Sequence, residues 1–99
     1  MTPDGRVHLG ALVLQSRVFG FERRGDELWL LPAQVGHPLV QVRGEGVRQR
    51  LWLTGAARDV AYELGLRAFG CSCDVLVEVR TDSVIVLCTA SPVRVRARR

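Results

Sequence analysis

The spacing of apolar and polar residues along this chain predicts mostly short strands. Residues 7–14 and 17–21 read as two strands, and the second alternates with Phe19 and Phe21 on one face. The sequence Arg23-Arg24-Gly25-Asp26 predicts a turn, because glycine tolerates the positive φ of a tight reversal. The chain then resumes with Glu27 and four apolar residues, so residues 27–31 complete a first hairpin.

Two further hairpins follow from the same pattern. Pro32 and Pro38 bracket a connection, after which residues 39–43 and 47–53 are expected to pair around Gly44-Glu45-Gly46. Residues 75–80 and 84–88 form the third hairpin, and both segments are apolar enough to be central strands.

One segment has helical spacing instead. Thr54 is suited to cap a helix whose apolar residues would be Ala57, Val60, Ala61 and Leu64. Gly65 is placed to end it in a left-handed conformation, with Leu66 folding back onto the helix. The expected fold class is therefore α+β: mainly antiparallel β, three hairpins in a curved sheet or partly open barrel, with one helix around 54–65. Residues 1–92 form a single domain and 93–99 a basic edge strand or tail.

The basic residues favour an anionic partner for this protein. All 14 are arginine, and the formal net charge of the 99-residue chain is +4. Arginine presents a flat fork of donors that suits phosphates and carboxylates. A coding bias in a high-GC source would give the same skew, since the chain has no asparagine and a single isoleucine, Ile85.

The main candidate site lies on the second hairpin. Alternation along residues 47–53 places Arg48, Arg50 and Trp52 on one face, with Arg43 near the turn. The opposite face would carry Val47, Leu51 and Leu53. Guanidiniums beside an indole suit single-stranded nucleic acid, because cations neutralise phosphates while a base stacks on the ring. The alternative is a solvated outer face on which an arginine stem covers Trp52 or the helix shelters it.

The C-terminal residues form a second basic candidate. Arg94 and Arg96 alternate with Val93 and Val95, and the chain closes with Arg98 and Arg99. The period of two predicts an edge strand that pairs with a second copy, giving a homodimer with a continuous basic stripe. A disordered basic tail that associates with any polyanion is the alternative.

The cysteines predict reduced thiols and no metal site. Cys71, Cys73 and Cys88 are an odd number, and pairing Val79 with Val84 would place Cys88 near Val75, at the end of the sheet. Cys71 and Cys73 could chelate zinc with Cys88, His8 or His37, but structural zinc sites usually have two close pairs of ligands.

No enzyme motif is recognisable in the sequence. It has no nucleophile elbow, phosphate loop or paired catalytic carboxylates, so we expect a non-enzyme without a cofactor. No apolar run approaches the ~18 residues of a membrane span, and no signal peptide opens the chain. The expected location is the cytoplasm.

Two hypotheses for function remain open at this point. One is a small nucleic-acid-binding module that acts through the arginine and tryptophan face and the basic C-terminus. The other is a protein-interaction or assembly module, such as a small bacterial, viral or phage regulator or inhibitor. This module would dock on an acidic protein or self-associate through its edge strands.

Overall fold

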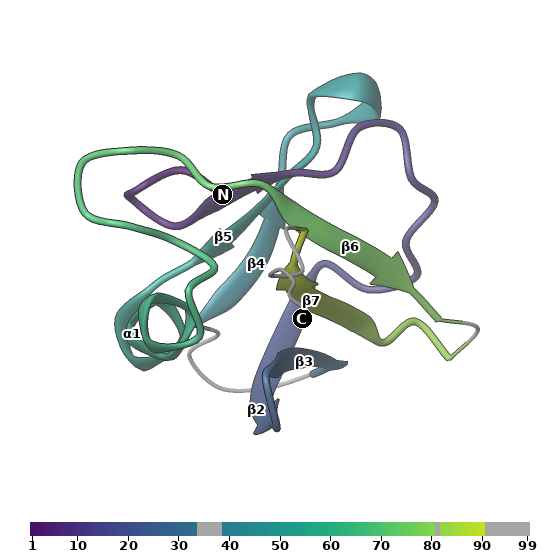
Figure 1. Ribbon diagram of the computed structural model, residues 1–99. Coiled ribbons are helices and arrows are strands. Elements are labelled where there is room, and N and C mark those ends of the chain that lie inside the picture. Colours follow the sequence, from purple (N-terminus) through teal and green to yellow (C-terminus); the bar gives the residue numbers. More distant parts are fainter. Residues whose placement is uncertain (34–38, 81, 91–99) are drawn as a thin grey trace.

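Within the residues that the structure describes, seven strands join into one antiparallel sheet that curves until it nearly closes as a barrel (Figure 1). The computed structural model describes residues 1–33, 39–80 and 82–90. The strands are β1 (Arg6–His8), β2 (Val18–Arg24), β3 (Glu27–Pro32), β4 (Val40–Arg43), β5 (Arg50–Leu53), β6 (Val75–Val79) and β7 (Ile85–Thr89). A 3-10 turn, η1 (Gly46–Arg48), precedes β5, and the helix α1 (Gly55–Glu63) follows it. The predicted α+β class is confirmed.

The sheet order is β1-β5-β4-β2-β3-β7-β6, so the three predicted hairpins are neighbouring pairs within it. In the first hairpin Arg24 pairs with Glu27 across Gly25, whose φ is +60°. In the third, Val79 pairs with Ile85 and not with Val84 as expected, which places Cys88 opposite Leu76. This register puts Ile85 and Leu87 in the core.

The first predicted strand is much shorter than residues 7–14. It ends at His8, and the chain leaves the sheet at Gly10, whose φ is +68°. The carbonyls of Gly10 and Leu12 accept hydrogen bonds from the Gln49 side chain instead of a neighbouring strand. Side-chain bonding to Gln49 thus replaces ladder pairing in this segment.

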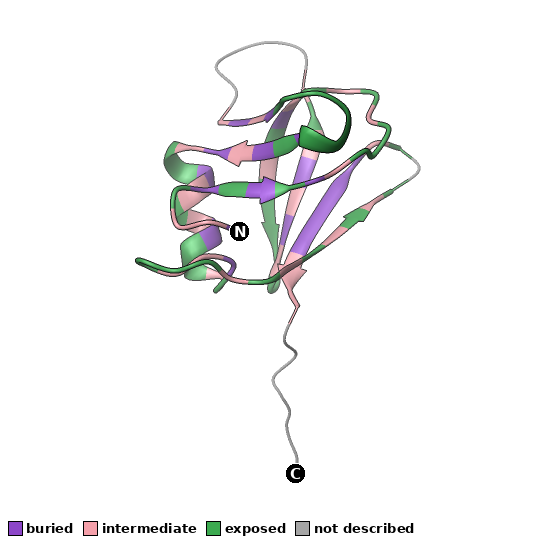
Figure 2. Cartoon of the chain, turned by 90° about the horizontal axis from the view of Figure 1, so that it is seen from above, coloured by how far each residue is buried: buried purple, intermediate pink, exposed green. Residues whose placement is uncertain are grey.

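Alternate residues of the strands fill the interior, as Figure 2 shows by burial colour. The largest fully buried side chains are Phe19, Leu28, Leu30, Val40, Leu51, Leu53, Leu66, Ile85 and Leu87. Helix α1 adds Ala57 and Ala61, both fully buried. Small residues on this face let the helix lie close to the sheet.

The helix begins and ends near the predicted residues. Thr54 precedes it, although its hydroxyl donates to the Leu39 carbonyl (3.1 Å) and makes no capping bond. At the other end Leu66 N–H donates to Ala61 O (2.9 Å) and Gly65 N–H to Tyr62 O (3.1 Å). With Gly65 at φ +78°, this pair of bonds is a Schellman ending.

The chain segments before β1 and β6, the two end strands of the sheet, are joined by hydrogen bonds across the gap where the barrel stays open. Cys73 N–H donates to Met1 O (2.9 Å), and the Met1 nitrogen donates to Cys73 O.

The predicted edge strand at 93–99 and the boundary at residue 92 lie outside the described residues. Within those residues, no helix is long and apolar enough to cross a membrane.

Candidate nucleic-acid interface

A pocket of about 190 Å³ lies on the outer face of the sheet over β1, β5 and β4. Its lining residues are Arg6, Arg43, Gly44, Arg48, Arg50 and Trp52. The structure therefore brings together all four site residues predicted from the second hairpin and adds Arg6 to them. We call Arg6, Arg43, Arg48, Arg50 and Trp52 the Trp52 cluster.

Strand register explains how three strands contribute to one face. Trp52 is directly opposite Arg6 of β1 on one side and Gln41 of β4 on the other. Arg50 lies two residues before Trp52, hence on the same face, and pairs with Arg43. The intervening residue Leu51 is fully buried. The outer face of this region is thus basic while its inner face is core.

Arg48 reaches the pocket by a different route from the predicted one. Strand β5 begins only at Arg50, and Arg48 belongs to the 3-10 turn η1. Val47, expected on the apolar face, is 70% exposed, so that part of the prediction is wrong. Glycines with positive φ at Gly44 (+84°) and Gly46 (+56°) turn the chain out of the strand before it can alternate.

Two guanidiniums lie against the Trp52 ring. The Cζ atom of Arg43 is 4.2 Å from the ring centroid and that of Arg6 is 4.8 Å away. At these distances cation–π attraction holds both guanidiniums over the half-buried indole. An arginine over Trp52 was the arrangement expected of a solvated face. A base at this site must stack on a guanidinium or displace one.

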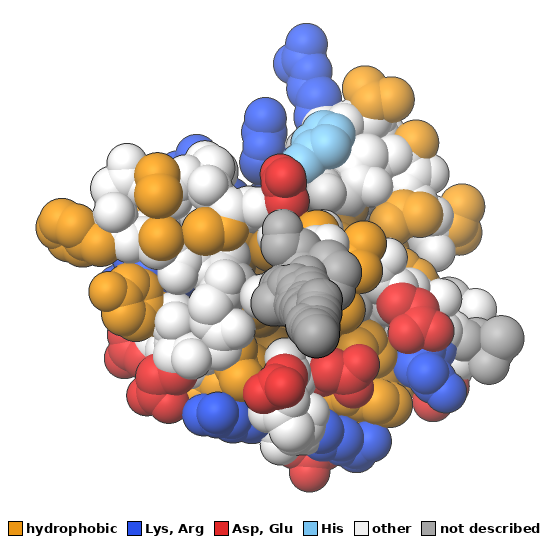
Figure 3. Space-filling view, viewed as in Figure 1, with side chains coloured by type: hydrophobic (Ala, Val, Ile, Leu, Met, Phe, Trp, Pro, Cys, Tyr) orange, Lys and Arg blue, Asp and Glu red, His pale blue; other side chains and the backbone are white. Residues whose placement is uncertain are grey.

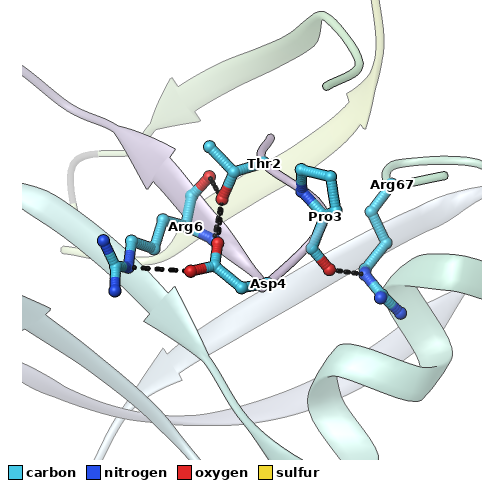
Figure 4. A network of polar contacts seen from close by, with 5 residues as sticks. All are labelled: Thr2, Pro3, Asp4, Arg6 and Arg67. Atoms are coloured by element: carbon cyan, nitrogen blue, oxygen red, sulfur yellow. Dashed lines mark hydrogen bonds and ion pairs between the residues drawn. The ribbon is translucent and has the colours of Figure 1, made fainter. Parts of the chain in front are cut away.

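A turn before β1 fixes Arg6 in this position (Figure 4). Asp4 Oδ2 is 3.3 Å from Arg6 Nε, and the Thr2 hydroxyl donates to the same carboxylate. The hydrogen bond from Thr2, together with the charge of Arg6, lowers the pKa of Asp4 below its usual value. Arg67 Nε donates to the Pro3 carbonyl (2.7 Å) and ties this turn to the segment after α1. Asp4 therefore both orients Arg6 and balances its charge.

Trp29 is the centre of a similar group on the other half of the sheet, and carboxylates offset its positive charges. The Cζ atoms of Arg24 and Arg80 lie 4.1 and 5.2 Å from the Trp29 centroid. Each of these arginines has a carboxylate partner: Arg24 pairs with Glu22 (2.7 Å) and Arg80 with Glu78 (3.6 Å). The indole N–H of Trp29 donates to Glu27 (3.1 Å). We call these three residues, with their three glutamates, the Trp29 cluster.

The Trp52 cluster lacks such balance. Within residues 1–33, 39–80 and 82–90, Arg43, Arg48 and Arg50 make no ion pair. Arg43 Nε has only the amide oxygen of Gln41, at 3.4 Å. In Figure 3 basic side chains project at the top of the view beside a histidine and an acidic group, whereas acidic and basic groups alternate along its lower edge. Three positive charges in one pocket thus lack a counter-charge in the described chain.

The other candidate residues do not gather into a site. Cys71 is exposed, while Cys73 and Cys88 are half-buried and unpaired. Burial, with the nearby carboxylates of Glu27 and Glu78, raises the pKa of the Cys88 thiol. Among the described residues, no group of three potential ligands could hold a metal ion. His37 lies outside the described residues, as do the predicted arginines Arg94, Arg96, Arg98 and Arg99.

Comparisons with known proteins add no assignment to this geometry. No protein-family model, curated protein or solved structure matches the chain.

Proposed function

We propose that this protein is a small, non-enzymatic, cytoplasmic module that binds single-stranded nucleic acid through the Trp52 cluster. The observation that carries the proposal is the convergence of Arg43, Arg48 and Arg50, without acidic partners in the described chain, beside the half-buried indole of Trp52. The arginines would contact phosphates, and the indole or a guanidinium lying on it would provide a flat surface for a base. The basic C-terminus would add further phosphate contacts.

The excess of positive charge in the pocket favours an anionic ligand. Like charges held close together repel, and a bound anion removes that repulsion while accepting hydrogen bonds from several guanidinium forks. Arg6 and Arg43 are also held in place before binding, because both guanidiniums lie on Trp52. Less side-chain entropy is then lost when these two arginines contact a phosphate.

The experiment compares two double variants that remove the same charge. Binding of a fluorescein-labelled oligothymidylate is measured by anisotropy, starting at ~50 mM salt, where phosphate contacts are strong. Arg48→Ala with Arg50→Ala should weaken affinity at least about ten-fold and flatten the salt slope by about 1.4, at ~0.7 for each single-strand phosphate contact. Arg24→Ala with Arg80→Ala, in the Trp29 cluster, is the matched control and should retain most of the affinity.

Fluorescence gives a second readout that is local to the pocket. In a Trp29→Phe variant Trp52 is the sole tryptophan, since the chain has two. Its emission should be quenched as the oligonucleotide is added. Failure of the wild-type protein to bind at ~50 mM salt would reject the proposal, and equal losses in both double variants would show diffuse attraction instead of a site.

A protein-interaction module is the second candidate, and one observation favours it. Strand β6 is at the end of the sheet order, pairs only with β7 among the described strands, and carries Leu76 with 55% exposure. An unpaired edge with an exposed leucine can add a strand from another copy or from an acidic partner. Sedimentation equilibrium of the full chain and of a chain lacking 93–99 tests this. A homodimer that persists without the tail supports pairing through β6, a homodimer that needs the tail assigns the contact to residues 93–99, and a monomer at ~100 μM opposes self-association.

A further inference from the structure

The pocket of the Trp52 cluster has more positive charge than one internal phosphate of a strand can balance. A phosphodiester carries a single negative charge, whereas a phosphomonoester carries about −1.5 to −2 at pH 7. Arg43, Arg48 and Arg50 have no ion-pair partner in the described chain, and Arg6 has only the half-exposed Asp4. Glu45, in the same connection, forms no ion pair with these arginines in the part of the chain that the structure describes. A group with two or more charges therefore matches the pocket better than a diester.

The pocket is also bordered by arginines on two sides and by the β4–β5 connection at one end. Arg6 on β1 and Arg43 on β4 border two sides, and the connection that contains Gly44 and Arg48 borders the end next to Arg50. Its volume of about 190 Å³ leaves room for a phosphate group and the atoms next to it.

We infer that the pocket takes a terminal phosphate, as a phosphomonoester or pyrophosphate group, in preference to an internal phosphodiester. The inference rests on the proposed function, because it takes the terminal phosphate to be the end of a nucleic-acid strand. Arg48 and Arg50 contact the phosphate oxygens at the end of the pocket nearest the β4–β5 connection. Trp52 lies two residues further along β5, about 7 Å away, where the adjoining sugar or base reaches it.

Competition binding tests the inference directly on the full chain. The ligands are one oligothymidylate sequence with a 5′-phosphate, with a 3′-phosphate and with hydroxyls at both ends, together with inorganic pyrophosphate and a nucleoside diphosphate. At least one terminal phosphate should raise affinity ten-fold or more, and pyrophosphate should compete. Arg48→Ala with Arg50→Ala should abolish this preference, while Arg24→Ala with Arg80→Ala should keep it.

The outcomes separate this inference from the proposed function. If all three oligonucleotides bind equally and pyrophosphate does not compete, the inference is wrong and strand binding stands. If pyrophosphate and the nucleoside diphosphate bind but no oligonucleotide does, the phosphate preference stands and its source is a free nucleotide. If none of these ligands binds, both proposals are wrong.

Discussion

A Cβ atom on Gly44 would lie 2.4 Å from the carbonyl oxygen of Arg48. The φ of Gly44 is +84°, a conformation that other L-residues rarely adopt. Both the backbone angle and the close approach thus require glycine where the β4–β5 connection leaves the sheet. This connection carries Arg48 into the pocket, so the glycine supports the Trp52 cluster as well as the turn.

Gly44→Ala should therefore lower both stability and ligand binding. The left-handed conformation costs a side chain about 1–2 kcal/mol, and relief of the contact with Arg48 adds to that loss. Urea denaturation measures the free energy of unfolding. Gly25→Ala is the control, because Gly25 has φ +60° and no atom lies within 4 Å of its Cβ position. Equal losses in the two variants would show that the contact with Arg48 contributes nothing.

Gln49→Leu should destabilise the protein by about 1–3 kcal/mol, because the change leaves two carbonyls without their donor. The Nε2 atom of Gln49 donates to Gly10 O (2.9 Å) and Leu12 O (2.7 Å), and the residue is buried. Limited proteolysis should show faster cleavage in residues 9–16. Gln41→Leu, at a half-exposed position, should not show it. Unchanged stability and cleavage in the Gln49 variant would refute this account of the segment.

The three thiols should differ in their rates of modification. Cys71 is exposed, whereas Cys88 is half-buried with a pKa raised by burial and by two nearby carboxylates. Because the thiolate is the reactive form, Cys88 should react more slowly than Cys71 with a maleimide near pH 7. Peptide mass spectrometry after timed quenching measures each site. A Cys71→Ser variant should lose the fast phase, and a fast reaction of Cys88 would contradict the structure.

Acid should weaken the ion pair between Asp4 and Arg6. The folded state lowers the pKa of Asp4, so its contribution to stability is present above the unfolded value of 3.8 and is lost as pH falls through the lower, folded value. The pair with Arg6 is about half exposed, so solvent screening limits the effect to less than about 1 kcal/mol. Asp4→Asn should match the wild type in acid and be slightly less stable at neutral pH. A constant difference between the two across this range would show that Asp4 does not titrate in this way.

Local signals predicted the fold well, and the site only in part. Turn and helix-stop signals at Gly25 and Gly65 need no knowledge of the rest of the chain, and both were found. Alternation placed Arg50 and Trp52 on one face for the same reason. Arg6 was missed because β1 and β5 are far apart in sequence, and only the folded sheet makes them neighbours.

The charge contrast between the two clusters was readable in the sequence. Residues two apart in a strand share a face, so the spacing of Glu22 with Arg24, and of Glu78 with Arg80 just after β6, indicates ion pairs. Arg50 and Trp52, at the same spacing in β5, include no acid. Arg48 could not be placed correctly, because the alternation of β5 does not extend back to it.

The three-residue strand β1 pairs only with β5 among the described strands and carries Arg6 into the pocket. An edge strand this short opens more easily than the central sheet, so its amide hydrogens exchange early. A ligand that bridges Arg6 and β5 would close this opening. The amides of Leu9 and Leu53, which bond to Gln49 O (3.0 Å) and Gly5 O (2.8 Å), would then exchange more slowly although neither lines the pocket. Ligand binding on the outer face would thus be detected as slower hydrogen–deuterium exchange of these backbone amides.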